Sequence, residues 1–414
     1  MKRGLDWDSF VRRHWEKAPA RLAPGLPVIP PEQAFRSAVS VCAPFRHGTR
    51  FRALPDVRFF VEDAQLAAPG PLLPSEDDVG LGGYVRRATA ALGGQKLQLL
   101  IEQPFMFDFA RWDSVRGFVR GLLERVGVPV LPIASDLILG NFGQSPRGVV
   151  KRPHHSLLTL VLQGRLRVRL WKRLWGDPPN ETTGFDRHHA EARTLEAGEG
   201  ELLYIPSHRW QLEEALGDCM ALRLWIPVQG SRPTDAVKDV LVSLLHGRLP
   251  HDEAVPYFPY PWRRPPRGKR SSVEPLEQTG DALHALTREP DVHQSLRIIW
   301  ARRVSACALE PAPPPDRAVP LRDSHRVRGV PSGDIVRMQD PSGQWIWAVN
   351  GHAFPGLDTP TAGRLLQALA SGETWSVGAL RGLARRGARR EELHAVLEKL
   401  QQLRALQRVS REEG

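Results

Sequence analysis

The sequence predicts an α+β protein built around an antiparallel β-barrel or sandwich. Between about residues 130 and 230, short apolar or alternating segments follow one another without a helical pattern between them. Helical periodicity dominates the segments before and after this region. Strands that recur at such short intervals pair as antiparallel neighbours, so we expect a central β-domain flanked by helices. The 414 residues are also too many for one ordinary hydrophobic core, which predicts two or three domains.

Four segments carry the strand prediction. Residues 157–162 form an apolar run, and after Gly164 the segment 166–170 alternates apolar residues with arginines. Residues 195–206 and 220–228 repeat the combination of a turn and an apolar strand. Side chains alternate across a strand, so the alternating segment has one buried and one exposed face. Gly164 therefore marks the turn of a hairpin.

Helices are predicted on both sides of this β-region. Asp8 is placed to cap a short helix near the start of the chain, and the prolines of residues 19–31 exclude regular structure after it. Residues 111–126 have helical periodicity. The apolar face of this helix contains Val115, Phe118, Val119, Leu122 and Leu123.

Beyond the β-region, residues 234–245 and 280–308 are predicted to be helical, and the basic, proline-rich segment 257–270 separates them as a loop. The apolar faces of these helices lie outside the barrel. Apolar faces of this size need a partner, and a symmetric homodimer is the commonest solution. We therefore expect a helical dimerisation segment here.

The end of the chain follows a second proline-rich linker at residues 310–320. Three helices are predicted in quick succession at about 360–371, 376–386 and 388–405. Short helices in this order, followed by a possible strand, predict a winged-helix-like domain. Its many arginines could contact phosphates, so binding of nucleic acid is a further hypothesis for this segment.

Composition limits the class of protein. The formal net charge is +11, which favours acidic partners. Cys42, Cys219 and Cys307 are far apart and form no CxxC pair, so the sequence predicts neither a disulfide framework nor a thiolate zinc site. The N-terminus has no secretory apolar core and no apolar run is long enough to span a membrane. We expect a cytoplasmic protein without a membrane partner.

Two segments resemble a known family. Residues 135–171 (SDLILGNFGQSPRGVVKRPHHSLLTLVLQGRLRVRLW) and 195–211 (LEAGEGELLYIPSHRWQ) resemble the barrel motifs of cupin/JmjC proteins of the ribosomal-oxygenase type. Residues 6–19 resemble the N-terminal helix of the same group. The resemblance implies a double-stranded β-helix barrel. It also implies four parts: an N-terminal region of helices and loops at 1–89, the barrel at 90–230, the dimerisation segment at 231–310, and the linker with the winged-helix-like domain at 311–414.

In that family, iron(II) and 2-oxoglutarate hydroxylate a protein side chain, and two histidines with one carboxylate hold the iron. The resemblance places Val150 at the first histidine, Arg152 at the carboxylate and Gln211 at the last histidine. Val150 has no donor atom, Arg152 is a permanent cation and Gln211 is a poor neutral ligand. The sequence therefore predicts no catalytic residue, no metal site and no cofactor.

Neighbouring residues offer one alternative. His154, His155 and His208 could form a relocated iron site, although loop or surface histidines are the simpler interpretation. Arginines near the cleft could instead hold a carboxylate directly. The residues expected to line this pocket are Asn141, Arg152, Thr159, Arg209 and Gln211.

Three functions are compatible with these patterns. The leading hypothesis is a non-catalytic cupin that binds a peptide or protein, or acts as the partner subunit of an active homologue. The second is a working iron(II)/2-oxoglutarate hydroxylase with relocated ligands. The third is a DNA-binding regulator that uses the tail to dock and the barrel as a sensor.

Overall fold

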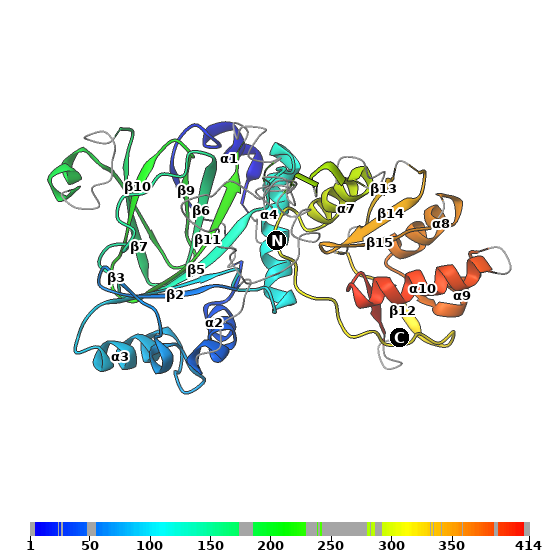
Figure 1. Cartoon of the computed structure of the whole chain (residues 1–414), viewed down its shortest axis with the longest axis horizontal. Helices are drawn as coiled ribbons and strands as arrows, with labels where there is room; N and C mark the ends of the chain where they lie inside the picture. Colours follow the sequence, from blue (N-terminus) through cyan, green and yellow to red (C-terminus); the bar gives the residue numbers. More distant parts are fainter. Residues whose placement is uncertain are drawn as a thin grey trace, which may run out of the picture.

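The structure is a computed structural model. It describes residues 5–23, 25, 28–47, 55–173, 185–228, 238, 241, 280–281, 283–285, 292–331, 333, 335–340, 342–357, 359–384 and 388–409. The described residues form a mixed α/β protein with a large antiparallel sheet, as the sequence predicted (Figure 1). No helix among them is both long enough and apolar enough to cross a bilayer.

An eight-stranded sheet forms one wall of the β-region. All of its described pairings are antiparallel. In spatial order its strands are β1 (Ala20–Leu22), β9 (Leu202–Ile205), β6 (His155–Gln163), β11 (Cys219–Pro227), β5 (Ala134–Gly140), β4 (Leu97–Glu102), β2 (Val57–Val61) and β3 (Ala64–Leu66).

A smaller sheet forms the opposite wall, with strand order β10 (Trp210–Ala215), β7 (Arg165–Trp171) and β8 (Arg193–Gly198). Apolar side chains from both sheets form one core, among them Ile138 and Leu166. The hairpin between β6 and β7 turns at Gly164, whose φ is +81°. A Cβ atom at that position would lie 2.0 Å from the Asp218 carbonyl oxygen, so the predicted turn requires glycine.

Among the described residues, α-helices accompany the β-region (Figure 1). They are α1 (Trp7–Arg13), α2 (Pro31–Arg46), α3 (Leu81–Ala91) and α4 (Phe109–Val126), and two short 3₁₀ helices occupy Gly70–Leu72 and Phe185–Glu191. The helix predicted at 111–126 is α4, and it buries Val115, Val119 and Leu122 as expected. Asp6 caps α1 by accepting a hydrogen bond from Ser9 N, so the predicted cap, Asp8, is two residues too late.

The N-terminal part contributes strands as well as helices. β1, β2 and β3 all lie before residue 90, where the sequence suggested only helices and loops. β1 lies inside the segment whose prolines were expected to exclude regular structure; its three residues pair with β9 at the edge of the sheet. A three-residue edge strand has too few residues to show a period of two.

The C-terminal half has its own core. Helix α7 (Val292–Ser305) packs on the sheet of β13 (Val336–Gln339), β14 (Trp345–Val349) and β15 (His352–Pro355). A second sheet contains β16 (Thr374–Ser376), β12 (Arg326–Gly329) and β17 (Leu406–Arg408). Helices α8 (Thr359–Ala370), α9 (Val377–Arg381) and α10 (Ala388–Gln402) complete it.

The three predicted tail helices therefore exist, but α9 and α10 end earlier than the sequence indicated. The assignment of this unit as a winged helix stays a prediction, as does its contact with nucleic acid. Arg381, one of the tail arginines, forms ion pairs with Asp323 at 2.8 Å and Glu391 at 2.6 Å. Most of the predicted dimerisation segment lies outside the described residues, and homodimer formation also stays a prediction.

The two halves are joined beside α4 (Figure 1). Trp112 Nε1 of α4 donates a hydrogen bond to the Leu309 carbonyl oxygen at 3.1 Å. Ile133 N, just before β5, donates to the Ala308 carbonyl oxygen at 2.7 Å. The segment that follows α7 is therefore fixed against the end of the barrel where β5 begins.

The loop before α3 is held by an ion pair that gives a stability prediction. Arg87 binds Asp78 through two nitrogens at 2.7 and 2.8 Å, and the Asp78 side chain is buried. Burial acts to raise the pKa of Asp78, but hydrogen bonds from Arg87 and Ser75 hold that pKa below its ordinary value of 3.8. The pair therefore stabilises the fold above pH 3.8, and this contribution is lost as the pH falls through the lower pKa of the folded state.

We expect Asp78→Asn to lower the free energy of unfolding at pH 6 by about 2 kcal/mol, because hydrogen bonds to a charged group are lost. The difference from the wild type should shrink as the pH falls below about 4. Urea unfolding at several pH values measures it. A difference that stays constant down to pH 2 would show that ionisation of Asp78 is not the cause.

Candidate ligand site at the mouth of the barrel

The two segments that resemble the family's metal-binding motifs lie side by side. Val150 N donates to the Gln211 carbonyl oxygen at 2.9 Å, and Gln211 N donates to the Val150 carbonyl oxygen at 2.9 Å. The next two residues use opposite faces. Lys151 Nζ lies 5.7 Å from the centre of the Trp210 ring, whereas the Arg152 guanidinium lies 3.9 Å from that of Trp225. Trp225 belongs to the core between the two sheets, so Arg152 turns toward the barrel interior.

A buried ion-pair network lies behind Trp225. Arg223 Nε binds Asp136 Oδ1 at 2.5 Å, and Arg223 Nη1 binds Glu213 Oε2 at 2.5 Å. Trp225 Nε1 donates to the other Asp136 oxygen at 2.9 Å. Burial opposes the charge of Arg223, but Asp136 and Glu213 outweigh it and raise the pKa of Arg223. The network joins both walls of the barrel, because Asp136 and Glu213 belong to different sheets.

Three polar atoms around this network lack a hydrogen-bond partner among the described residues. They are Arg223 Nη2, Glu213 Oε1 and Thr159 Oγ1, and all three are buried. Thr159 is the cross-strand neighbour of Arg223, so the atoms belong to one part of the interior. Buried polar atoms are normally satisfied by protein, water or a bound group. This part of the barrel is therefore suited to water or to a polar group of a ligand.

Arg147 and Arg152 add positive charge at the mouth. Both side chains are half-buried, and within the described part of the chain neither has an ion-pair or hydrogen-bond partner. Burial is the largest cause that lowers the pKa of each. Repulsion from Arg223 and Arg58 adds to it at Arg147. At Arg152, attraction by Asp136 opposes it, and repulsion from Arg223 and Arg147 adds to it by a smaller amount. A guanidinium stays charged at neutral pH even so.

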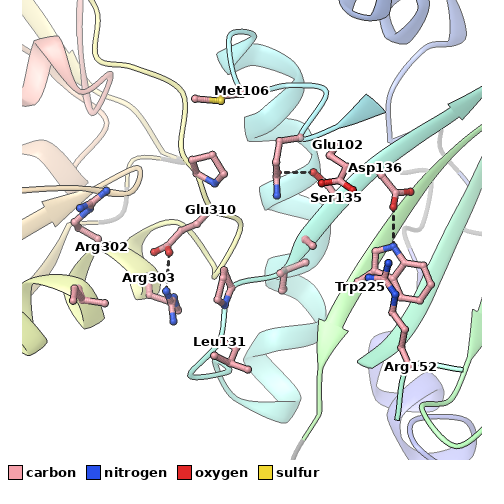
Figure 2. A pocket seen from close by; sticks show the side chains of 16 residues that line it. Glu102, Met106, Leu131, Ser135, Asp136, Arg152, Trp225, Arg302, Arg303 and Glu310 are labelled. Atoms are coloured by element: carbon pink, nitrogen blue, oxygen red, sulfur yellow. Dashed lines mark hydrogen bonds and ion pairs between the residues drawn. The ribbon is translucent and has the colours of Figure 1, made fainter. Parts of the chain in front are cut away.

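A cavity of about 700 Å³ opens beside Trp225, between the barrel and the C-terminal half (Figure 2). The lining residues are Glu102, Gln103, Met106, Leu131, Pro132, Ile133, Ala134, Ser135, Asp136, Arg152, Trp225, Ile299, Arg302, Arg303, Glu310 and Pro311. Figure 2 shows Arg152 and Trp225 on one side of the view, and Arg302, Arg303 and Glu310 on the other. Both halves of the chain therefore build one cavity.

The five residues expected to form a pocket lie in different places. Arg152 lines this cavity, and Gln211 is buried at the pair with Val150. Thr159 is in the barrel interior beside Arg223. Asn141 joins β4 to α3, because its side chain accepts from Leu97 N at 3.0 Å and donates to Thr89 Oγ1 at 3.2 Å. Arg209 lies just before β10. Burial is the main cause that lowers its pKa, and repulsion from Arg193 lowers it further.

The histidines considered as relocated ligands are not part of any group of three metal-binding side chains among the described residues. His155 is the first residue of β6. Burial is the main cause that lowers its pKa, and the charge of Arg152 lowers it further. His154 precedes it in a turn, and His208 is exposed in the turn that precedes β10. Within the ranges that the structure describes, no three His, Cys, Asp or Glu side chains are grouped so as to hold a metal ion.

The sequence matches no known family profile and no curated protein. Solved structures of similar fold exist. E. coli YcfD is 17% identical and has a TM-score of 0.52, with 98% of each chain covered. Two further structures of YcfD, a ribosomal oxygenase, were solved with cobalt and succinic acid and with cobalt and 2-oxoglutarate. Each is 17% identical over 98% of this chain and 99% of that one, with TM-scores of 0.49 and 0.48.

These complexes correct the expectation that no cofactor is involved. The E. coli protein was solved in complex with cobalt and succinic acid and in complex with cobalt and 2-oxoglutarate. The expectation was drawn from three aligned residues. Those residues exclude only a metal that Val150, Arg152 and Gln211 would hold, and they do not exclude every cofactor.

The donor atoms at those three positions do not fit iron(II). They supply an alkyl group, a cation and an amide where two imidazoles and a carboxylate are needed. At about 4 Å and an effective dielectric constant of about 20, the Arg152 charge would repel each unit of metal charge by about 4 kcal/mol. The comparison therefore establishes a similarity of fold and leaves the chemistry to the residues of this chain: the residues that the structure describes have a fold similar to that of the E. coli protein YcfD.

Proposed function

We propose that this chain is a JmjC-like oxygenase-fold protein that binds a peptide or protein segment at the mouth of its barrel and does not hydroxylate it. One observation carries the proposal. At the position where the resemblance expects the carboxylate ligand, the guanidinium of Arg152 is stacked 3.9 Å from the centre of the Trp225 ring. The ring holds the cation in place, because a guanidinium is attracted to an aromatic face.

The cavity supports the binding part of the proposal. Its volume of about 700 Å³ lies in the usual range for ligand sites, roughly 300–1,000 Å³. Met106, Leu131, Ile133 and Ile299 give it an apolar wall, and charged groups lie on either side. A peptide presents the same mixture of apolar and polar groups. The proposal does not depend on the absence of cofactors, since a metal or a 2-oxo acid bound elsewhere in the barrel is compatible with it.

Turnover of 2-oxoglutarate tests the proposal. The wild-type chain, supplied with iron(II), ascorbate and 2-oxoglutarate under air, is expected to form succinate no faster than a protein-free sample. E. coli YcfD, assayed alongside, controls for the reagents. Turnover that requires this protein, and that is lost when His154, His155 or His208 is changed to alanine, would support the relocated hydroxylase instead.

A further inference from the structure

Some of the charged side chains that line the cavity form ion pairs with described residues, and others do not. Six of the lining residues are charged: Glu102, Asp136, Arg152, Arg302, Arg303 and Glu310. Glu102 is bound by Arg58 at 3.1 Å, Asp136 by Arg223 at 2.5 Å and Glu310 by Arg303 at 2.8 Å. Among the described residues, the two lining side chains left without an ion pair are both arginines, Arg152 and Arg302.

The position of the Arg152 guanidinium suits it to bind an anion. The Trp225 ring lies against the guanidinium, and this stacking leaves the N–H groups at its edge without a hydrogen-bond partner among the described residues. These N–H groups form a planar fork that matches a carboxylate. Arg147 lies close enough to repel Arg152 and, like it, has no partner in the described part of the chain. Arg302 Nε donates a hydrogen bond to the Gly351 carbonyl oxygen at 3.0 Å. The two terminal nitrogens of Arg302 have no hydrogen-bond partner among the described residues.

We propose that the ligand of this cavity is an acidic protein segment, one of whose carboxylates binds the guanidinium of Arg152. The proposal rests on the proposed function and names the class of its partner. Arg147 and Arg302 add positive potential on two sides. Like charges brought together in a half-buried site repel one another, and a bound carboxylate relieves that repulsion.

The shape of the cavity favours a protein segment over a free carboxylic acid. The apolar wall of Met106, Leu131, Ile133, Ile299 and Pro311 gives no polar partner to a small dicarboxylate. In a peptide, the residues beside the acidic one can cover that wall. An acidic residue flanked by apolar ones therefore fits both parts of the cavity.

Fluorescence anisotropy with the full chain tests the proposal. The probes are three rhodamine-labelled peptides in which leucine alternates with glutamate, glutamine or lysine. We expect saturable binding of the glutamate peptide that weakens with added salt, and no binding of the other two. Arg152→Gln should weaken it about tenfold or more, because a charged hydrogen bond is lost. Arg152→Lys, which keeps the charge without the fork, should have an intermediate effect.

A matched control separates the site from general charge. Arg165→Gln removes one positive charge from the outer face of β7, where Arg165 pairs with Glu196, and should leave the affinity unchanged. Arg152→Gln should also unfold at the same temperature as the wild type or a higher one, because it removes an unpaired, half-buried charge. A large loss of stability would show that Arg152 serves the fold, and would overturn the proposal.

The outcomes distinguish this inference from the proposed function. If the glutamine or lysine peptide binds as well as the glutamate peptide, peptide binding stands and the acidic partner is wrong. If free glutarate binds the wild type but not Arg152→Gln, and no peptide binds, the ligand is a small dicarboxylate and both proposals fail. Binding of the glutamate peptide that Arg165→Gln weakens as much as Arg152→Gln would also overturn the inference.

Discussion

Arg223→Met is expected to destabilise the protein by about 3–5 kcal/mol, the usual cost of removing one partner from a buried ion pair. Arg223 is only 4% exposed, and it binds Asp136 and Glu213 from opposite walls of the barrel. Without it, two carboxylates are buried with no cation to neutralise them. They should bind protons, so the variant should be least stable relative to the wild type at high pH. Urea unfolding between pH 5 and 9 measures both effects.

A combined variant provides the control. Adding Asp136→Asn and Glu213→Gln to Arg223→Met removes the unpaired charges, and Asn still offers an oxygen to Trp225 Nε1. This triple variant should recover most of the lost stability, because neutral polar groups cost less to bury than charges. If Arg223→Met alone unfolds within about 1 kcal/mol of the wild type, the network is not what holds the two sheets together.

Val150→His, Arg152→Asp and Gln211→His, made together, are expected to produce metal-dependent succinate formation where the wild type gives none. The backbone pair between Val150 and Gln211 places two of these positions side by side. Replacing Arg152 by aspartate turns a repulsion of about 4 kcal/mol per unit of metal charge into an attraction of similar size. The substitutions supply two imidazoles and a carboxylate, the usual ligands of non-haem iron. Succinate release with and without iron(II) measures the gain.

Each single substitution is the control for the combination. One restored ligand cannot hold iron against water, so the single variants should stay at the background rate. A triple variant that folds, as judged by circular dichroism, but gains no turnover would show that the rest of the barrel no longer fits the reaction. Turnover by Arg152→Asp alone would show that neighbouring residues already supply the other ligands.

Much of the barrel was predictable because its strands have a clear period. The segments 157–162 and 166–170 lie in strands, the segment 220–228 lies in β11 except for its last residue, and the turn at Gly164 is where the sequence placed it. Helices α2 and α3 were missed. α2 contains Pro44 and three buried serine or alanine residues, Ala34, Ser37 and Ala38, which weakens the apolar stripe that marks a helix. Such helices are stabilised mainly by tertiary contacts, so their position cannot be predicted from hydrophobic periodicity alone.

The candidate site was only partly predictable. The two motifs were enough to expect Val150 and Gln211 in the same part of the barrel cleft, and in the structure the two residues form a backbone bridge. The Arg223 network was missed, although a lone arginine in the apolar strand MALRLWIPV was a usable signal. Its partners could not be named in advance. Asp136 is 87 residues away and belongs to a different strand, so the sheet order had to be known first.

The far wall of the cavity could not be predicted at all. Arg302, Arg303 and Glu310 come from α7 and the segment after it, and their place opposite Trp225 depends on how the halves of the chain dock. No periodicity within either half encodes that contact. Arg152 and Arg302, which have no ion pair among the described residues, could therefore be related to each other only once both walls were known.

Crystals soaked with Co²⁺ and examined at the cobalt absorption edge test the central claim most directly, because they show where a metal binds. In the wild type we expect no anomalous peak within about 2.5 Å of a side-chain atom of Val150, Arg152 or Gln211, since metal–ligand distances there would be about 2.0–2.3 Å. The triple variant Val150→His, Arg152→Asp and Gln211→His should show a peak bound by all three side chains. A fully occupied cobalt ion among these residues of the wild-type protein would contradict the account.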